Sequence, residues 1–349
     1  MRTSVIQDPS LASFLETLCC PACGARLQAT TDAEEACTSL QCEACGESYP
    51  IVRGIPRAVR SSMRDALQSL EPGDDAESMK AATARSFGYE WSRFPEMHAE
   101  YERNFLDYQA PHGPDFFRGK RVLDAGCGSG RHAYYAARFG AEVWAVDLGP
   151  AVEVARRNNA GEGVRVVQAD LYHLPFAPET FDYIYSNGVL HHLPDPEGGF
   201  RSLLRHLKPG GEIRIYLYWR PEGQPIKRGL LAIATALRRL TTRLPYPAVH
   251  ALSYPTALLA FGVFVWPYRL MRRLPGLKSL AERIPMKQYA NYPFRVCVND
   301  QFDRLSAPIE NRYSRSEVEE WLRRAGLEET NVLPNYGWIG RGVKPLITR

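Results

Sequence analysis

The sequence predicts an α/β fold built on a doubly wound parallel sheet, with a small metal-binding unit before it and a helical insertion within it. Three observations indicate this arrangement. Short apolar stretches, several ending in a carboxylate, alternate with helical stretches between residues 119 and 219. A turn with three glycines follows the first of these stretches, and two Cys-x-x-Cys pairs lie near the N-terminus. The 349 residues predict about two domains.

The N-terminal unit, residues 14–60, is defined by its cysteines. Cys20 and Cys23 form one pair, and Cys42 and Cys45 form the other, with 18 residues between the pairs. Two such turns present four thiolates to one ion and complete a closed tetrahedron, which is typical of structural zinc. Using Cys19 in place of Cys20 would break the spacing, so we favour Cys20. Four unrelated thiols remain the less favoured alternative.

Two stretches of this unit, LCCPACGARL and LQCEACGESYPIVRGIPRAV, carry a resemblance. They resemble the zinc-ribbon protein that activates tRNA and release-factor methyltransferases, over about Phe14 to Val59. Here the ribbon is fused to a longer chain. The resemblance therefore implies a built-in structural or docking role rather than regulation of a separate partner.

A polar linker is expected at residues 61–84. It has the sequence Pro-Gly-Asp-Asp at its middle, which predicts a loop or a short exposed helix. The stretch FGYEWSRF, residues 87–94, follows it and opens the unit 85–222. We expect this stretch to form a lid over a cofactor, with Tyr89 and Trp91 as candidate contacts. Plain aromatic packing is an equal alternative.

Five strands are expected in the sheet, at residues 120–124, 141–147, 164–170, 181–188 and 211–219, the last after a turn at 208–211. The first three end in Asp124, Asp147 and Asp170. Ligands of such sheets bind at the carboxyl ends of the strands. These carboxylates are therefore expected at the site.

The glycine turn distinguishes between cofactor classes. Gly126, Gly128 and Gly130 have the spacing G-x-G-x-G, one residue shorter than the dinucleotide fingerprint. Asp147 would accept ribose hydroxyls in either class. Asp124, two residues before the first glycine, would repel a pyrophosphate and attract an ammonium group. This favours S-adenosylmethionine, which carries an amino acid and no phosphate.

Three stretches in order now carry a second resemblance: VLDAGCGSGRHAYYAARFGAEVWAVDLGPAVEVARRNN, VVQADLYHLPFAPETFDYIYSNGVLHHLPDP and LLRHLKPGGEIRIYLY. They resemble a class I S-adenosylmethionine-dependent methyltransferase of the type 11 kind, a Rossmann-like fold, over about Gly119 to Trp219. The resemblance implies that Asp124, Gly126 and Gly128 hold the methionine part. It implies the ribose at Asp147 beside Leu148, the adenine at Asp170 and Leu171, and the methyl group above Asn187 and Gly188.

Catalysis by methyl transfer needs a positioned nucleophile and, in some cases, a base that removes its proton. His191 and His192 follow the fourth strand and are the candidate catalytic residues. A structural role for at least one of them is the favoured alternative.

The insertion, residues 223–292, is strongly basic. It holds eleven Lys and Arg and one Glu, a net charge of +10, whereas the chain as a whole carries +4. The stretches GLLAIATALRRLTTRL and TALLAFGVFVWPYRLMRR predict amphipathic helices, and the apolar run 257–266 is too short to span a bilayer. A helical cap over the site is favoured. A helix in the plane of an anionic membrane surface is the alternative, and an RNA surface is the third.

The last unit, residues 293–349, has a helix that starts near Ser314 or Ser316 and stops at Gly326. It resembles the family's final helix and strand. Arg312 and Tyr313 are substrate or capping candidates.

The expected function is S-adenosylmethionine-dependent methyl transfer to O or N of a small-molecule, lipid-linked or glycan-linked acceptor, with structural zinc. One alternative is an rRNA or tRNA methyltransferase that holds RNA with the ribbon and the basic insertion. Another is a non-enzymatic docking protein that senses the cofactor. Since the N-terminus has no signal-peptide pattern, we expect a cytoplasmic protein, or one peripheral at the membrane.

Overall fold

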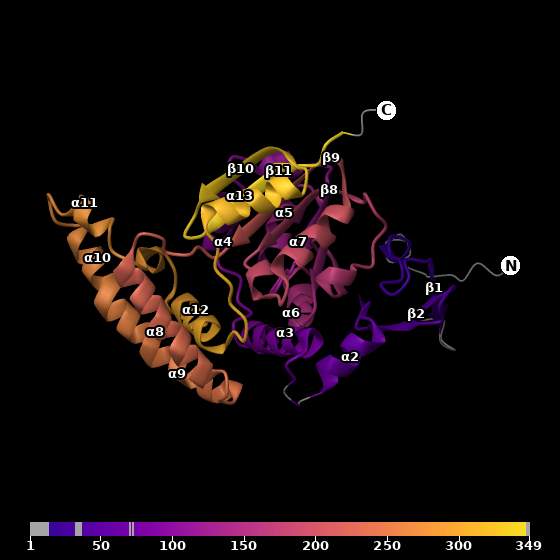
Figure 1. Cartoon of the computed structure of the whole chain (residues 1–349), viewed down its shortest axis with the longest axis horizontal. Coiled ribbons are helices and arrows are strands. Elements are labelled where there is room, and N and C mark those ends of the chain that lie inside the picture. Colours follow the sequence, from indigo (N-terminus) through magenta and orange to yellow (C-terminus); the bar gives the residue numbers. More distant parts are fainter. Residues whose placement is uncertain (1–13, 32–36, 70, 72, 347–349) are drawn as a thin grey trace.

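The computed structural model describes residues 14–31, 37–69, 71 and 73–346 (Figure 1). The N-terminal segment on which the cytoplasmic expectation depends lies outside these residues. So do parts of the predicted ribbon and linker and the last three residues of the predicted C-terminal unit. The described chain forms two sheets and an arm of helices.

The N-terminal unit is a four-stranded antiparallel sheet in the order β1-β2-β3-β4. Its strands are β1 (Leu27–Thr31), β2 (Cys37–Cys42), β3 (Ser48–Val52) and β4 (Ile55–Pro56). The unit docks on the large sheet: Leu18 bridges to Phe176, and Arg57 pairs in parallel with Gln168. The ribbon therefore covers the outer edge of the large sheet, which would otherwise expose unpaired backbone groups.

The large sheet has the order β10-β11-β9-β8-β5-β6-β7. Its strands are β5 (Arg121–Ala125), β6 (Glu142–Asp147), β7 (Arg165–Gln168), β8 (Phe181–Asn187), β9 (Leu207–Leu217), β10 (Glu328–Pro334) and β11 (Trp338–Val343). The pairs from β7 to β9 are parallel, and β10 and β11 join antiparallel at the far edge. All five predicted sheet strands are present.

Helices cover both faces of this sheet. Alternate strand residues face opposite ways, so Leu123 and Val122 enter different cores. Leu123 packs with α7 (Pro196–Arg205), α13 (Arg315–Arg324) and the ribbon. Val122 packs with α4 (Glu100–Gln109), α5 (Arg131–Arg138) and α6 (Ala151–Asn158). The predicted doubly wound α/β fold is thereby confirmed.

The expected linker contains two helices, α2 (Ser61–Gln68) and α3 (Ala76–Arg93). The Asp75 carboxylate caps α3 by accepting from the backbone N–H groups of Glu77 and Ser78, both at 3.0 Å. No proline interrupts the helix before residue 93. The prediction of a loop or short exposed helix was therefore wrong for residues 76–84, which continue directly into the predicted lid.

The expected turn at 208–211 also differs from the structure. Strand β9 already begins at Leu207, and the turn is a shift in its register with β8. Gly210 has a φ of +75°, which lets the chain bulge without breaking the strand.

The insertion forms an arm on the side of the large sheet away from the ribbon (Figure 1). Its elements are α8 (Pro225–Thr241), α9 (Tyr246–Ala260), the π-helical turn η4 (Phe261–Val265), α10 (Trp266–Met271) and α11 (Lys278–Ala281). Both α8 and α9 pack on α12 (Phe294–Ser306), which joins the arm to the core. Within the described residues, Tyr246–Met271 is the one continuous helix whose length and composition, with a mean hydropathy of 1.6, would allow it to cross a membrane.

Candidate functional site

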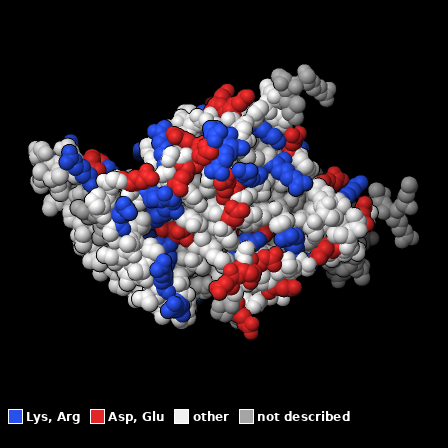
Figure 2. Space-filling model, in the orientation of Figure 1, with Lys and Arg blue, Asp and Glu red and all other residues white. Residues whose placement is uncertain are grey.

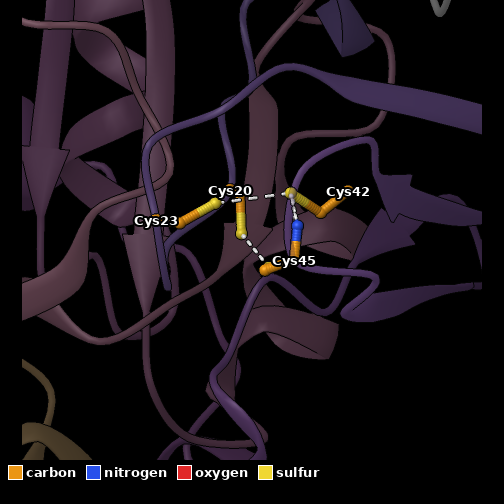
Figure 3. A group of neighbouring side chains, drawn as sticks. All are labelled: Cys20, Cys23, Cys42 and Cys45. Atoms are coloured by element: carbon orange, nitrogen blue, oxygen red, sulfur yellow. Dashed lines mark hydrogen bonds between the residues drawn. The ribbon is translucent and has the colours of Figure 1, made fainter.

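The four predicted metal ligands converge on one point (Figure 3). The Sγ atoms of Cys20 and Cys45 lie 3.7 Å apart, those of Cys23 and Cys42 lie 3.4 Å apart, and all four lie within 4.8 Å of one another. A tetrahedron of zinc–sulfur bonds of about 2.3 Å has edges of about 3.8 Å. The donor set therefore fits a closed zinc site, and Cys19 is outside it, as the spacing predicted.

Two features prepare these sulfurs for a metal. Burial opposes ionisation of Cys42, but the backbone N–H groups of Cys45 and Ala44 hydrogen-bond its sulfur and lower the pKa of the thiol to about 6. The buried Tyr49 hydroxyl lies 3.2 Å from Cys20 Sγ. Such an outer contact orients a ligand and tunes its charge. The sequence analysis did not identify Tyr49 as part of the site.

The glycine turn follows β5 and requires its glycines. Gly126, Gly128 and Gly130 have φ values of +88°, +52° and +76°. A Cβ on Gly126 would lie 2.4 Å from Val189, and one on Gly128 would lie 2.7 Å from the indole nitrogen of Trp91. Val189 and Trp91 thus lie too close to the turn for a side chain at either glycine, and the positive φ values favour glycine there as well.

Asp124 at the end of β5 is a buried acid with an unsatisfied oxygen. The residue is 2% exposed, and its Oδ2 atom has no hydrogen-bond partner among the described residues. Burial raises the pKa of this carboxyl to about 7. A buried carboxylate in this state is stabilised by a cation, so the position fits the ammonium group of an amino acid.

Asp147 lies at the end of β6, and its carboxylate braces the turn. Its Oδ2 accepts from the Gly128 N–H at 3.0 Å, and its Oδ1 accepts from the Gly149 N–H at 2.9 Å. Burial raises the pKa of this acid as well. The predicted ribose-binding residue therefore sits directly against the predicted methionine-binding turn. Its neighbour Leu148 packs against the small cluster formed by Val59, Met63 and Ala81.

Asp170 has a partner that the sequence analysis did not identify. It forms a buried ion pair with Lys80 of α3, and its Oδ1 accepts from the Tyr172 N–H at 3.1 Å. Burial opposes ionisation of Asp170, but the nearby His173 ring and the Lys80 ammonium lower its pKa. The next residue, Leu171, is buried. Asp170 thus remains charged, and its charge is already paired with that of Lys80.

Asn187 at the end of β8 faces the first turn of α5. Its Nδ2 atom lies 3.2 Å from Nδ1 of His132, and its Oδ1 atom is buried with no partner in the described chain. Burial lowers the pKa of His132 well below its usual range, so the ring is neutral and Nδ1 can accept from the amide. Gly188 follows with a φ of +80°. An unpaired amide oxygen therefore remains near the glycine turn for a ligand group.

The two predicted lid residues of α3 lie apart. Trp91 covers Gly128, and the guanidinium of Arg131 stacks on its ring at 5.0 Å. Tyr89 instead packs with Tyr246 of the arm and Phe302 of α12. The structure therefore places Trp91, but not Tyr89, at the predicted cofactor turn.

His191 and His192 are both buried. His191 stacks on Tyr218 with ring centroids 3.8 Å apart, and burial lowers its pKa well below the usual range. Nδ1 of His192 lies 2.6 Å from the Ile309 carbonyl oxygen, an acceptor, so Nδ1 carries the proton and donates. The pair supports Tyr218 and the chain near residue 309 rather than facing an open site.

A cluster of tyrosines and aspartates lies where α12 meets the carboxyl end of the sheet. The Tyr218 hydroxyl donates to Oδ2 of Asp303 at 3.0 Å, while Oδ1 of Asp303 is buried without a partner in the described residues. Tyr289 donates to Asp300, whose charge acts on Arg131 directly after the glycine turn. We call these residues the acidic cluster. No sequence motif marks it, because Asp300 and Asp303 reach the sheet only through the fold of the insertion.

Comparison with known proteins agrees with this geometry. A family model described as a methyltransferase domain matches residues 123–215, and one described as a Trm112p-like protein matches residues 12–54. A demethylmenaquinone methyltransferase of Clavibacter sepedonicus is 36% identical over 130 residues, covering 36% of this chain and 53% of the relative. A ubiquinone biosynthesis O-methyltransferase of Sodalis glossinidius is 34% identical over 165 residues, covering 46% of this chain and 65% of the relative.

Among solved structures, the YcgJ protein of Bacillus subtilis is 28% identical, with a TM-score of 0.33, and the match covers 40% of this chain and 59% of that one. The chain spans between 31% and 65% of the length of the first curated relatives it matches. The two family-model matches agree with the predicted pairing of a zinc ribbon with a methyltransferase core. Residues 123–215 of the chain thus match a methyltransferase domain, and they lie behind an N-terminal stretch, residues 12–54, that matches a Trm112p-like protein.

Proposed function

We propose that this protein transfers the methyl group of S-adenosylmethionine to an oxygen or nitrogen atom of a small, lipid-linked or glycan-linked acceptor. The observation that carries the proposal is the buried carboxyl group of Asp124, one oxygen of which has no hydrogen-bond partner among the described residues, beside a glycine turn that admits no side chain. This pair matches an amino-acid ammonium and carboxylate, and the family match to residues 123–215 agrees with it.

The cofactor, when bound, supplies an electrophilic methyl group on a sulfonium. The chain's own part is to hold that group in place. Asp124 would pair with the ammonium, Asp147 would accept from the ribose hydroxyls, and Asn187, whose amide oxygen has no partner among the described residues, would lie below the transferred methyl group. Alignment of donor and acceptor in this way is the main contribution that a protein makes to such a displacement.

For the acceptor, we propose a position in the acidic cluster. Asp303 holds an unpaired oxygen and receives a hydrogen bond from Tyr218, so it is suited to take a proton from a hydroxyl acceptor. The names of two relatives mention menaquinone and ubiquinone, which supports an acceptor carrying a lipid chain. The base is then Asp303 rather than His191 or His192, which are buried behind Tyr218.

We further propose that the ribbon serves its own chain. Cys19 N–H donates to the Pro175 carbonyl at 2.8 Å, the Trp144 indole donates to Thr17 at 3.1 Å, and Arg57 pairs with Glu153. A ribbon fixed in this way supports the methyltransferase domain without a separate partner. The protein would work in the cytoplasm, with contact to the membrane through its arm.

The experiment uses methyl-labelled S-adenosylmethionine and an extract of the host lacking this gene. Label is measured in lipid, small-molecule, protein and RNA fractions, with the Asp147→Ala variant as control. Label in the lipid or small-molecule fraction that the variant does not produce supports the proposal. Label in RNA would instead assign the ribbon and the basic insertion to an RNA substrate. Absence of label in every fraction would refute methyl transfer and favour a cofactor-sensing role.

A further inference from the structure

The arm exposes apolar side chains along a helix that is already anchored on its other side. Every three to four residues, a buried side chain of α9, η4 and α10 faces the protein: Val249, Ser253, Ala257, Phe261, Val265 and Tyr268. The opposite side of the same helix exposes Leu252, Leu259, Val263, Trp266 and Leu270, with Leu259 at 66% and Leu270 at 63%. The surface of a soluble monomeric protein rarely exposes so continuous an apolar stripe unless the stripe binds another molecule or a membrane.

A second stripe lies on α8. Its exposed side chains are Ile233, Leu237 and Leu240, spaced by three or four residues, and the exposed Leu244 follows in the turn after the helix. The same helix is held to the core by the buried ion pair of Arg238 with Glu310 at 2.8 Å. The apolar side chains of this stripe are therefore exposed on a helix that is held to the core. We call the two stripes together the apolar face of the arm.

Charge indicates the kind of partner. The insertion contains one acidic residue, Glu282, and this residue is paired with Lys287. Exposed arginines flank the apolar face, among them Arg243, Arg269, Arg272 and Arg273. In Figure 2 the outer surface of the arm is mostly white, with blue basic groups along its border and at its tip. A hollow of about 430 Å³, lined in part by Arg220, Arg228 and Arg239, lies along α8.

From these observations we infer that the apolar face of the arm docks in the plane of an anionic lipid membrane. Apolar side chains enter the acyl boundary, Trp266 lies at the interface, and the flanking arginines contact acidic headgroups. The helix Tyr246–Met271 is long enough to cross a bilayer, but its anchored side packs on the protein from Val249 to Tyr268. Crossing would remove that packing, so the helix lies in the plane instead.

This inference goes beyond methyl transfer and does not depend on it. Its test is cosedimentation of the full chain with vesicles of phosphatidylcholine alone, or of phosphatidylcholine and phosphatidylglycerol in equal parts. We expect binding to the acidic vesicles only, with a blue shift of tryptophan fluorescence that is lost in Trp266→Phe. The double variant Leu259→Glu with Leu270→Glu is expected to bind at least about tenfold more weakly. Leu346→Glu, which changes an equally exposed leucine outside the arm, is the matched control and should bind as the parent does.

Charge-reversal variants test whether the arginines beside the apolar face contribute to membrane binding. Arg272→Glu with Arg273→Glu should weaken binding to acidic vesicles, and Arg118→Glu on the core should not. Thermal unfolding measured by circular dichroism establishes that each variant is folded, independently of any activity. Equal binding of the leucine double variant and the parent would overturn the inference, as would no binding of the parent to acidic vesicles. A stable dimer in the absence of lipid, broken by the leucine double variant, would assign the face to self-association instead.

Discussion

Asp124→Asn is expected to stabilise the ligand-free protein while it removes cofactor binding. The substitution keeps the shape of the side chain and removes its charge. In the parent, the carboxyl is buried and one of its oxygens has no partner among the described residues. Its charged form is therefore disfavoured until a cation arrives, and the amide has no charge to bury.

The magnitude follows from the pKa. Burial raises the pKa of Asp124 from 3.8 to about 7, so the folded state binds this proton more tightly than the unfolded state. The contribution of Asp124 to the free energy of unfolding is therefore greatest at low pH, and it falls as the pH rises from about 4 to about 7. The integrated loss is about 4 kcal/mol above pH 7, as an upper bound. An ammonium partner would reverse that loss.

The assay has two readouts. Thermal unfolding without ligand is measured at about pH 8 and at about pH 4, where the variant should be more stable than the parent only at the higher pH. Calorimetry with S-adenosylhomocysteine should show parent binding that weakens up to about tenfold per unit below pH 7, and no binding by the variant. Equal stability of the two proteins at the higher pH, or cofactor affinity retained by the variant, would refute the role given to Asp124.

Four further predictions follow from the site. Asp147→Ala should lose cofactor binding in calorimetry while the protein stays folded by circular dichroism; unchanged affinity would contradict the ribose assignment. Elemental analysis should find one zinc ion per chain in the parent and none in Cys42→Ser, which should also unfold at a lower temperature; a parent that is folded without metal would exclude the zinc site. Asp303→Asn should lower kcat at least about tenfold with little change in cofactor affinity, because it removes a proton acceptor; an unchanged kcat would exclude that role. Tyr218→Phe should lower kcat with little change in cofactor affinity, since the Asp303 carboxylate then loses the hydrogen bond that holds it in position; an unchanged kcat would mean that this bond does not act on the base.

The strands and the cofactor edge were predictable from sequence because their signals are local. A buried parallel strand needs a continuous apolar stretch, and the turn after β5 needs glycines at positive φ. The cysteine pairs likewise fix their own geometry through two short turns. In each of these cases the residues that determine the structure are neighbours in the chain.

The remaining features depend on contacts between distant parts of the chain. Lys80 lies in a segment predicted as linker, and it reaches Asp170 only because α3 lies across the end of β7. Tyr89 was expected near the cofactor, but the arm packs around it. The favoured cap interpretation of the insertion differs from the structure in one respect, since many of its leucines are exposed rather than buried. Helical periodicity gives the side of a helix that is apolar, but not what covers that side.

Helix α3 connects parts of the molecule that are otherwise far apart. Near its start Lys80 holds Asp170, near its end Trp91 covers Gly128, and between them Ser86 donates to the Ser306 hydroxyl of α12 at 2.9 Å. The 18 residues of this helix span about 27 Å in one uninterrupted element. If a bound ligand displaces Trp91, the change in α3 also acts on its contact with α12, the helix that joins the arm to the core. If binding at the arm changes the affinity for the cofactor through this helix, thermodynamic reciprocity requires the cofactor to change the affinity of the arm by the same factor.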